Sequence, residues 1–373
     1  MIPLSKPDIT QLEINRVTTV LNSQYISGGP VVTEFEAKLA AIAGTQFAVA
    51  VSSGTAALHL LMLALGIGPG DEVITTPYSF IASANCILYV GATPVFCDIS
   101  LRDLNIDPEQ IAAKITPRTK AILAVHVFGF PAAMEPILQI AAAHNLPVIE
   151  DACEAIAAKA GGRPVGGMGI AGTFAFYPNK QITTGEGGAI VTNDSALAGM
   201  VRSLANQGRD YDNQWLRHVR LGYNYRLSEL ASALGCSQLE RLDAILKKRA
   251  EVAEWYYQAL GEEPLVTLPN PALSPQNEVS WFVYVVRFAT PPLREHVSNH
   301  LTNHGVQNRP YFPAIHLQPF YGARFGYAAG AFPNTETAAA TSLALPFFTR
   351  MTQAEVRTVC DQIRNALDTY RPQ

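Results

Sequence analysis

Between Gln46 and Thr192 the chain alternates short runs that favour β-strands with longer segments of helical pattern. The strand-like runs include "FAVAVSS", "DEVITTP", "TPVFCDI", "KAILAVHVFG" and "LPVIEDA". The segments between them, among them residues 55–65, 80–89 and "MEPILQIAAAHN", are helical in composition or spacing and long enough to recross a sheet. This alternation predicts the α/β class, with a mostly parallel sheet covered by helices.

The pattern changes after residue 192, where a long helix is expected to open at Ser228 and to bridge two domains. Beyond it, the Pro- and Asn-rich "PLVTLPNPALSPQNEV" precedes a strand in "SWFVYVVRFA" and helices near 292–304 and 352–367. We therefore expect a large domain over residues 1–245 and a smaller C-terminal α+β domain over residues 246–373.

Composition excludes several classes of function. The net charge is -4 and the charges of both signs are interspersed, which disfavours nucleic acid and anionic membranes as partners. No apolar run reaches the roughly 20 residues of a membrane span and no signal-like segment opens the chain, so a cytoplasmic location is expected. The five cysteines form no CxxC pair, and we interpret them as reduced core thiols rather than disulfides or metal ligands.

One lysine stands in an unusual setting. The stretch "TFAFYPNKQITTGEGGAIVT" places Lys180 in a glycine-rich loop between two strand-like runs, 172–177 and 188–192. Glycines at this density indicate positive φ angles or a close approach of the backbone to another group, although an ordinary turn is the simpler alternative. Because ligands of parallel α/β sheets bind beyond the carboxyl ends of strands, groups at other strand ends could share a site with Lys180.

Three such groups follow strands. In "VSSGTAALHL" a helix begins at Gly54 and Thr55, whose N–H groups suit a phosphate, although a simple helix cap would explain the same residues. Asp151 lies near the end of "LPVIEDA", and Phe80 is the last residue of "TTPYSF", just past a strand end; either could be structural. Together with Lys180 they match the needs of pyridoxal 5'-phosphate (PLP): a lysine, an acidic partner for the pyridine nitrogen, a phosphate cup and a stacked aromatic.

Over nearly its whole length the chain resembles the DegT/DnrJ/EryC1/StrS family of PLP-dependent sugar aminotransferases. The motifs that carry the match are, in order, "YISGGPVVTEFE", "SSGTAALHL", "GDEVITTPYSFIASANCILYVGATPVFCDI", "VIEDACEA", "FAFYPNKQITTGEGGAIVT", "GYNYRLSEL" and "RPYFPAIHLQP". The resemblance implies fold type I, in which a mostly parallel seven-stranded sheet forms the large domain and a smaller α+β domain follows.

The resemblance also implies roles for single residues. Lys180 is expected to form the Schiff base with PLP, Asp151 to pair with the pyridine nitrogen and Phe80 to stack on the ring. Gly54 and Thr55 are expected to bind the phosphate.

The sequence departs from the family pattern at two positions. Glu154 stands where many members carry glutamine or histidine near the ring oxygen O3', which changes the local charge. Ala175 stands where many members carry a serine that contacts the phosphate. Thr173, Ser53 or backbone N–H groups would have to replace that contact.

Further expected contacts involve the second half of the chain. In the family the asparagine of "GYN", here Asn224, reaches the phosphate of the neighbouring subunit's cofactor, which implies a homodimer with shared active sites. Arg226 would bind the carboxylate of the amino donor, and Tyr311 and His316 would contact a sugar nucleotide. A turn before the long helix and domain packing are the structural alternatives for these two segments.

The expected reaction moves an amino group from L-glutamate or glutamine to a nucleotide-linked 3- or 4-keto-deoxy sugar, in polysaccharide or natural-product biosynthesis. Lys180 would serve as Schiff-base partner and as general acid and base. The alternatives are amination of a keto-cyclitol, PLP-dependent sugar dehydration, in which histidine replaces the lysine, and a non-catalytic regulator, which should lack part of the cofactor set.

Overall fold

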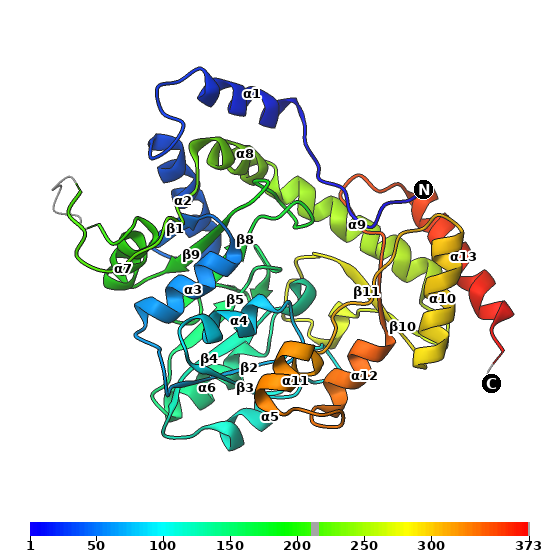
Figure 1. Ribbon diagram of the computed structural model, residues 1–373. Coiled ribbons are helices and arrows are strands. Elements are labelled where there is room, and N and C mark those ends of the chain that lie inside the picture. Colours follow the sequence, from blue (N-terminus) through cyan, green and yellow to red (C-terminus); the bar gives the residue numbers. More distant parts are fainter. Residues whose placement is uncertain (210–215, 372–373) are drawn as a thin grey trace.

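The computed structural model describes residues 1–209 and 216–371 and contains a large sheet-based unit and a smaller C-terminal unit (Figure 1). The large unit holds a seven-stranded sheet in the order β1-β9-β8-β5-β4-β2-β3. Its strands are β1 (Phe47–Val51), β2 (Glu72–Thr75), β3 (Thr93–Phe96), β4 (Thr119–Val125), β5 (Val148–Asp151), β8 (Ala171–Ala175) and β9 (Gly188–Thr192). Only β9 runs antiparallel to its neighbours among these strands, which confirms the predicted α/β class and mostly parallel sheet.

Helices bury both faces of this sheet. One face is covered by α3 (Gly54–Ala64), α4 (Ala82–Tyr89) and α7 (Ser195–Ala205), and the other by α2 (Pro30–Ala43), α6 (Met134–Ala143) and α8 (Glu229–Glu240). Side chains of a strand alternate between faces, so Ala48 and Ala50 join one apolar cluster while Val49 and Val51 join the other. Burial on both faces explains why "FAVAV" is continuously apolar.

The smaller unit is built on an antiparallel sheet of β10 (Val266–Thr267), β11 (Tyr284–Phe288) and β12 (Ser342–Leu345). Helices α9 (Leu242–Leu260), α10 (Pro291–Asn303) and α13 (Gln353–Thr369) pack on it. The other α-helices and strands, short 3-10 turns apart, are α1 (Gln11–Leu21), α5 (Pro108–Ile111), β6 (Lys159–Ala160), β7 (Arg163–Pro164), α11 (Pro319–Phe325) and α12 (Pro333–Thr341). In the described ranges 1–209 and 216–371, no helix is long and apolar enough to cross a membrane.

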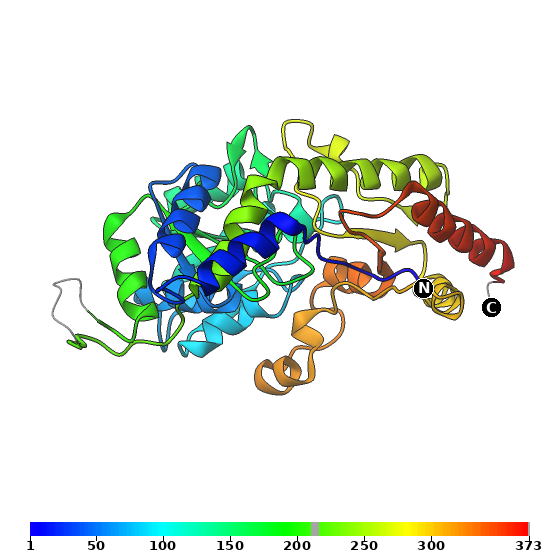
Figure 2. The ribbon, with the colours of Figure 1, turned by 90° about the horizontal axis from the view of Figure 1, so that it is seen from above.

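Helix α9 connects the two units, as Figure 2 shows from above. Its first turns, at Leu242 and Ile245, belong to the apolar core of the large unit, and Val252 and Tyr256 belong to the core of the smaller one. This change of partners supports the proposed boundary after residue 245. The first residues of the chain lie against the smaller unit instead, since the N–H of Ile2 donates to Gly305 O at 2.9 Å.

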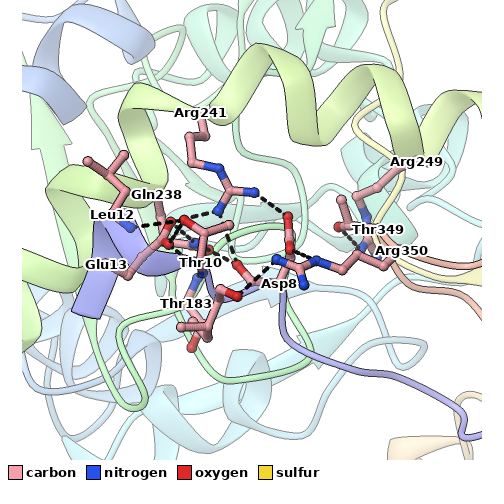
Figure 3. Close-up of polar contacts among 11 residues, drawn as sticks. Asp8, Thr10, Leu12, Glu13, Thr183, Gln238, Arg241, Arg249, Thr349 and Arg350 are labelled. Atoms are coloured by element: carbon pink, nitrogen blue, oxygen red, sulfur yellow. Dashed lines mark hydrogen bonds and ion pairs between the residues drawn. The ribbon is translucent and has the colours of Figure 1, made fainter. Parts of the chain in front are cut away.

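The long helix expected from Ser228 is two helices, because the backbone turns at Arg241 between α8 and α9. A polar network surrounds this break (Figure 3). The Asp8 carboxylate lies between the guanidinium groups of Arg241 and Arg350, and the Glu13 carboxylate accepts hydrogen bonds from Arg241 and Gln238 at 2.7 and 2.8 Å. The N-terminal segment thus ties the helix junction to the loop before α13.

We predict that Asp8→Ala lowers the free energy of unfolding by about 2–4 kcal/mol, because it removes the carboxylate partner of Arg350 and one of the two carboxylate partners of Arg241. Denaturant titration measures the loss. The control is Glu251→Ala, which removes an exposed i,i+3 pair with Lys248 and should leave stability unchanged. Equal effects of the two substitutions would contradict the importance of the Asp8 network.

The network also predicts an acid dependence. Burial by itself would raise the pKa of Glu13, but hydrogen bonds from Thr10, Arg241 and Gln238 outweigh it and lower the pKa to about 2. A lowered pKa in the folded state stabilises the fold above the unfolded value, near 4.5, and this contribution is lost as the pH falls toward 2. Between pH 4.5 and 2 the free energy of unfolding should therefore depend less steeply on pH for Glu13→Gln than for the wild type. An equal pH dependence of the two proteins would refute the lowered pKa of Glu13.

Candidate active site

A cavity of about 480 Å³ lies beyond the carboxyl ends of β1, β2, β4, β5 and β8 and is closed on one side by the smaller unit. The fold therefore places strand ends that are far apart in sequence around one space. Of the residues expected from the sequence to form the site, the cavity brings together Gly54, Thr55, Phe80, Asp151, Glu154, Lys180 and Tyr311.

Asp151, the last residue of β5, is held in a fixed orientation at the bottom of this site. Its Oδ2 accepts a hydrogen bond from the Ser83 hydroxyl at 2.7 Å, and its Oδ1 accepts one from the Cys153 N–H at 3.2 Å. The side chain is buried, with 5% of its surface exposed. These two contacts fix the orientation of the carboxylate, whose oxygens can also accept a hydrogen bond from a protonated ring nitrogen.

The Lys180 ammonium group is contacted by a carboxylate and an aromatic ring. Its Nζ lies 3.4 Å from Oε1 of Glu154 and 3.9 Å from the ring centroid of Phe282. The loop that carries it is held by Gln181, whose side chain donates to Glu154 O and Ser280 O at 2.7 and 2.9 Å. The lysine therefore reaches the cavity from a braced loop, with the smaller unit supplying one wall.

Glu154 has a second partner, since its Oε2 accepts a hydrogen bond from the Phe128 N–H at 2.9 Å. Burial raises the pKa of the Glu154 carboxyl, and the nearby Lys180 charge reduces this effect without cancelling it. The carboxyl therefore gains a proton more easily than an exposed glutamate. This property lets it serve as either donor or acceptor toward a polar group in the cavity.

Phe282 is itself fixed by a buried cation. Arg249, in α9, donates to the carbonyl oxygens of Trp281 and Phe282, each at 2.6 Å, and its side chain has no carboxylate partner within the described residues. Burial lowers the pKa of Arg249 to about 9. Since the guanidinium is surrounded by carbonyl groups, it holds the backbone beneath the ring that faces Lys180.

The start of α3 provides the anion-binding end of the cavity. The Ser53 hydroxyl accepts from the Ala56 N–H at 3.0 Å, which caps the helix. No acceptor for the N–H groups of Gly54 and Thr55 occurs in residues 1–209 or 216–371, so both are available to a ligand at the positive end of the helix dipole. The helix cap and the phosphate cup are therefore compatible interpretations of the same turn.

Close packing at a glycine keeps this turn in place. A Cβ atom on Gly188, the first residue of β9, would lie 2.4 Å from the carbonyl carbon of Ser53 and 2.5 Å from the nitrogen of Gly54. A Cβ on Gly54 would lie 2.7 Å from the Cβ of Ala175. Gly188 is required because backbone approaches backbone too closely for a side chain, and Gly54 because the side chains of Ala175 and Cys153 fill the space that its Cβ would take.

Of the two hydroxyl groups expected to replace the phosphate contact of the family's serine at Ala175, only that of Ser53 lies at the cavity. Thr173 is fully buried, and its hydroxyl donates to Glu150 O at 3.4 Å rather than lining the cavity. Ser53 does line the cavity, next to the free N–H groups of the helix start. Ser53 and the backbone are thus the groups positioned to hold a phosphate.

The cavity fits PLP by three observations. The buried Oδ1 of Asn179, which lines the cavity, lacks a hydrogen-bond partner within the described chain. Phe80 is 59% exposed at the rim, where an aromatic side chain would otherwise be expected to pack. The helix start and Asp151 offer complementary groups to a phosphate and to a protonated ring nitrogen.

Three of the expected site residues lie elsewhere. Asn224 and Arg226 are exposed and do not line this cavity; the Arg226 guanidinium donates to Asn206 Oδ1 at 2.8 Å. His316 is fully buried, 3.1 Å from a Glu336 carboxylate oxygen, and packs edge-on against Phe332. The structure therefore gives His316 a packing role and does not bring it to the cavity.

Other cavity residues were missed by the sequence reasoning. Ser83 lies three positions after Phe80, so one helical turn places it near the same strand end, and this spacing could have suggested it. Asn179 stands directly before Lys180 in the glycine-rich loop, which could have suggested it, whereas Phe282 gave no such signal. Phe282 belongs to a strand-like run about 100 residues from Lys180, and only tertiary packing brings the two together.

The model of the DegT/DnrJ/EryC1/StrS aminotransferase family matches residues 7–364. GDP-perosamine synthase of Caulobacter vibrioides is 40% identical over 98% of this chain and 97% of its own, and the Bacillus subtilis spore coat polysaccharide biosynthesis protein SpsC is 38% identical over 98% and 96%. The structure of S. venezuelae DesV superimposes with a TM-score of 0.93 at 33% identity, covering 99% of both chains.

We predict that Gly188→Ala weakens PLP binding at least tenfold, because the added methyl group must displace the start of α3. Titration with PLP, followed by visible absorption, measures the affinity. Gly199→Ala is the matched control: its Cβ would meet open space in α7, so this variant should bind PLP like the wild type. Unchanged affinity in Gly188→Ala would show that the close approach is not required for binding.

Proposed function

The chain belongs to the DegT/DnrJ/EryC1/StrS aminotransferase family and is a PLP-dependent sugar aminotransferase, and from this premise we propose its substrates. We propose that L-glutamate or glutamine donates the amino group and that a nucleotide-linked 3- or 4-keto-deoxy sugar accepts it. The names of two relatives support this, since one is a GDP-perosamine synthase and the other serves polysaccharide biosynthesis. Biosynthesis of a polysaccharide or an amino-sugar natural product is the proposed setting.

The observation that carries the proposal is the shared cavity of Lys180, Asp151 and the start of α3. Lys180 is proposed to hold the cofactor through Nζ and, once released, to carry the proton that amino transfer requires. Bound PLP supplies an electron sink for this reaction. Asp151, held by Ser83, is proposed to keep the proton on the ring nitrogen, and a protonated ring is the stronger electron sink.

The remaining cofactor contacts are proposed from the same arrangement. The N–H groups of Gly54 and Thr55 bind the phosphate, and Phe80 covers the ring. Glu154, which lines the cavity with a carboxyl whose pKa is raised by burial, would contact the ring oxygen. Tyr311 lines the mouth of the cavity and remains the proposed contact for the sugar nucleotide.

We propose that two chains complete each other's sites. Asn224 and Arg226 are exposed on one protomer and turned away from its own cavity, as expected if they serve a partner's cofactor and amino donor. Large apolar side chains are exposed nearby in sequence, with Leu221 at 83% and Val219 at 38% exposure. A homodimer interface at this segment would bury these apolar side chains. The cytoplasmic location stays a prediction.

We predict that Lys180→Ala loses turnover and the visible band of lysine-bound PLP, whereas the wild type shows the band and L-glutamate bleaches it. The control is Lys159→Ala, which removes an exposed lysine paired with Glu278 and should behave as the wild type. Full activity of Lys180→Ala would refute its assigned role. A wild-type band that neither L-glutamate nor glutamine changes would refute the proposed donors.

A further inference from the structure

A second cavity, of about 400 Å³, lies where the smaller unit meets the large one. Its walls come from the loop at residues 101–104, the turn at residues 128–131, strands β10 and β11, and the segment that joins these strands. Its volume falls in the range of small-molecule sites, roughly 300–1,000 Å³. Apart from the Phe128 side chain, which also packs toward the cofactor cavity, its walls are separate from the site described above.

Arg287 is a positively charged side chain in the wall of this cavity. It lies on β11, is half-buried, and donates one hydrogen bond, from Nη2 to Leu101 O at 2.9 Å. No carboxylate pairs with it in residues 1–209 or 216–371, and its other N–H groups have no acceptor there. Burial lowers the pKa of Arg287. The guanidinium N–H groups that do not bind Leu101 are therefore available to an anion in the cavity, which they could bind through charge-assisted hydrogen bonds.

The other charges of the cavity do not neutralise Arg287. Asp103 lies beside Arg102 in sequence, its carboxylate accepts from the Asn105 N–H at 3.1 Å, and burial raises its pKa. The charge of Arg102 lowers the pKa of Asp103 without cancelling the effect of burial, and no ion pair joins Asp103 to Arg287 in the described residues. The remaining polar lining includes the amides of Asn270 and Asn277, and the rest is mostly Leu, Phe, Pro and Val.

The turn at Phe128 links the two cavities physically. The Phe128 ring lines the second cavity and stacks on Phe312, which lines the cofactor cavity, with ring centroids 5.1 Å apart. Its N–H donates to Glu154, the carboxylate next to Lys180. Phe128 has a φ of 58°, a left-handed conformation that is strained for a residue with a Cβ. A shift of this turn therefore moves a hydrogen-bond donor of the active site.

We propose that this cavity is an effector site for a small organic oxyanion, a phosphate or carboxylate attached to an apolar or aromatic body. Arg287 binds the oxyanion through its free N–H groups, and the apolar walls hold the body. Occupation changes the environment of Lys180 through Phe128 and Glu154. The proposal does not depend on which donor or sugar the enzyme uses.

The test is calorimetric titration of the PLP-loaded enzyme with phenyl phosphate, and with benzoate as the carboxylate arm. Phenol supplies the aromatic ring without the anion and inorganic phosphate supplies the anion without the ring, so each should bind more weakly than phenyl phosphate. Arg287→Gln should weaken phenyl phosphate binding tenfold or more, and Arg287→Lys, which keeps the charge, should restore part of it. Arg357→Gln removes an exposed arginine of α13 and should bind as the wild type does.

Two further measurements guard against misfolding and against binding elsewhere. Val283→Phe places bulk in the cavity while it leaves Arg287 in place, so it should abolish binding with an unchanged visible spectrum. Phenyl phosphate should shift the pH midpoint of the visible band of lysine-bound PLP in the wild type and not in Arg287→Gln. Binding that survives Arg287→Gln, absence of binding to the wild type, or binding without that shift would overturn the proposal.

Discussion

The contact between β9 and the start of α3, at Gly188, is the constraint on which the active site depends. Gly188 lies so close to the backbone of Ser53 and Gly54 that no side chain fits between them. The contact holds the two free N–H groups beside the end of β8, and the loop between β8 and β9 carries Lys180. The close contact of Gly188 with the Ser53–Gly54 backbone thus positions both the phosphate-binding turn and Lys180, although Gly54 and Lys180 are 126 positions apart in sequence.

Much of the architecture could be predicted from the sequence because it depends on local periodicity. Each strand-like run expected between residues 46 and 192 contains or overlaps a strand of the large unit, although two runs extend three or four residues past the strand end. Asp151 and Gly54 were found because they end or follow strands. What could not be predicted depends on contacts between distant segments. The break at Arg241 interrupts an unbroken helical pattern, because carboxylates from the N-terminal segment bind there.

The same reasoning explains why the second half of the chain was harder to interpret. Motif resemblance suggested substrate contacts for both Tyr311 and His316, yet only Tyr311 lines the cavity. The side chain of His316 turns to Glu336 and an aromatic cluster, which no spacing rule distinguishes from a binding role. Arg249 holds Phe282 in place by binding the carbonyl groups of Trp281 and Phe282. Because its partners are backbone atoms and not an acidic side chain, no pair of opposite charges in the sequence indicates this contact.

The N-terminal segment has a consequence for how the chain is made. Ile2 and Leu4 hydrogen-bond to the backbone at Gly305 and Phe347, and Asp8 binds Arg350. Residues 2–8 therefore meet these partners only after residues 305–350 have been synthesised. Because domains generally fold as units during synthesis, contacts between segments so far apart in sequence form late, and those of residues 2–8 are among the last to complete the smaller unit.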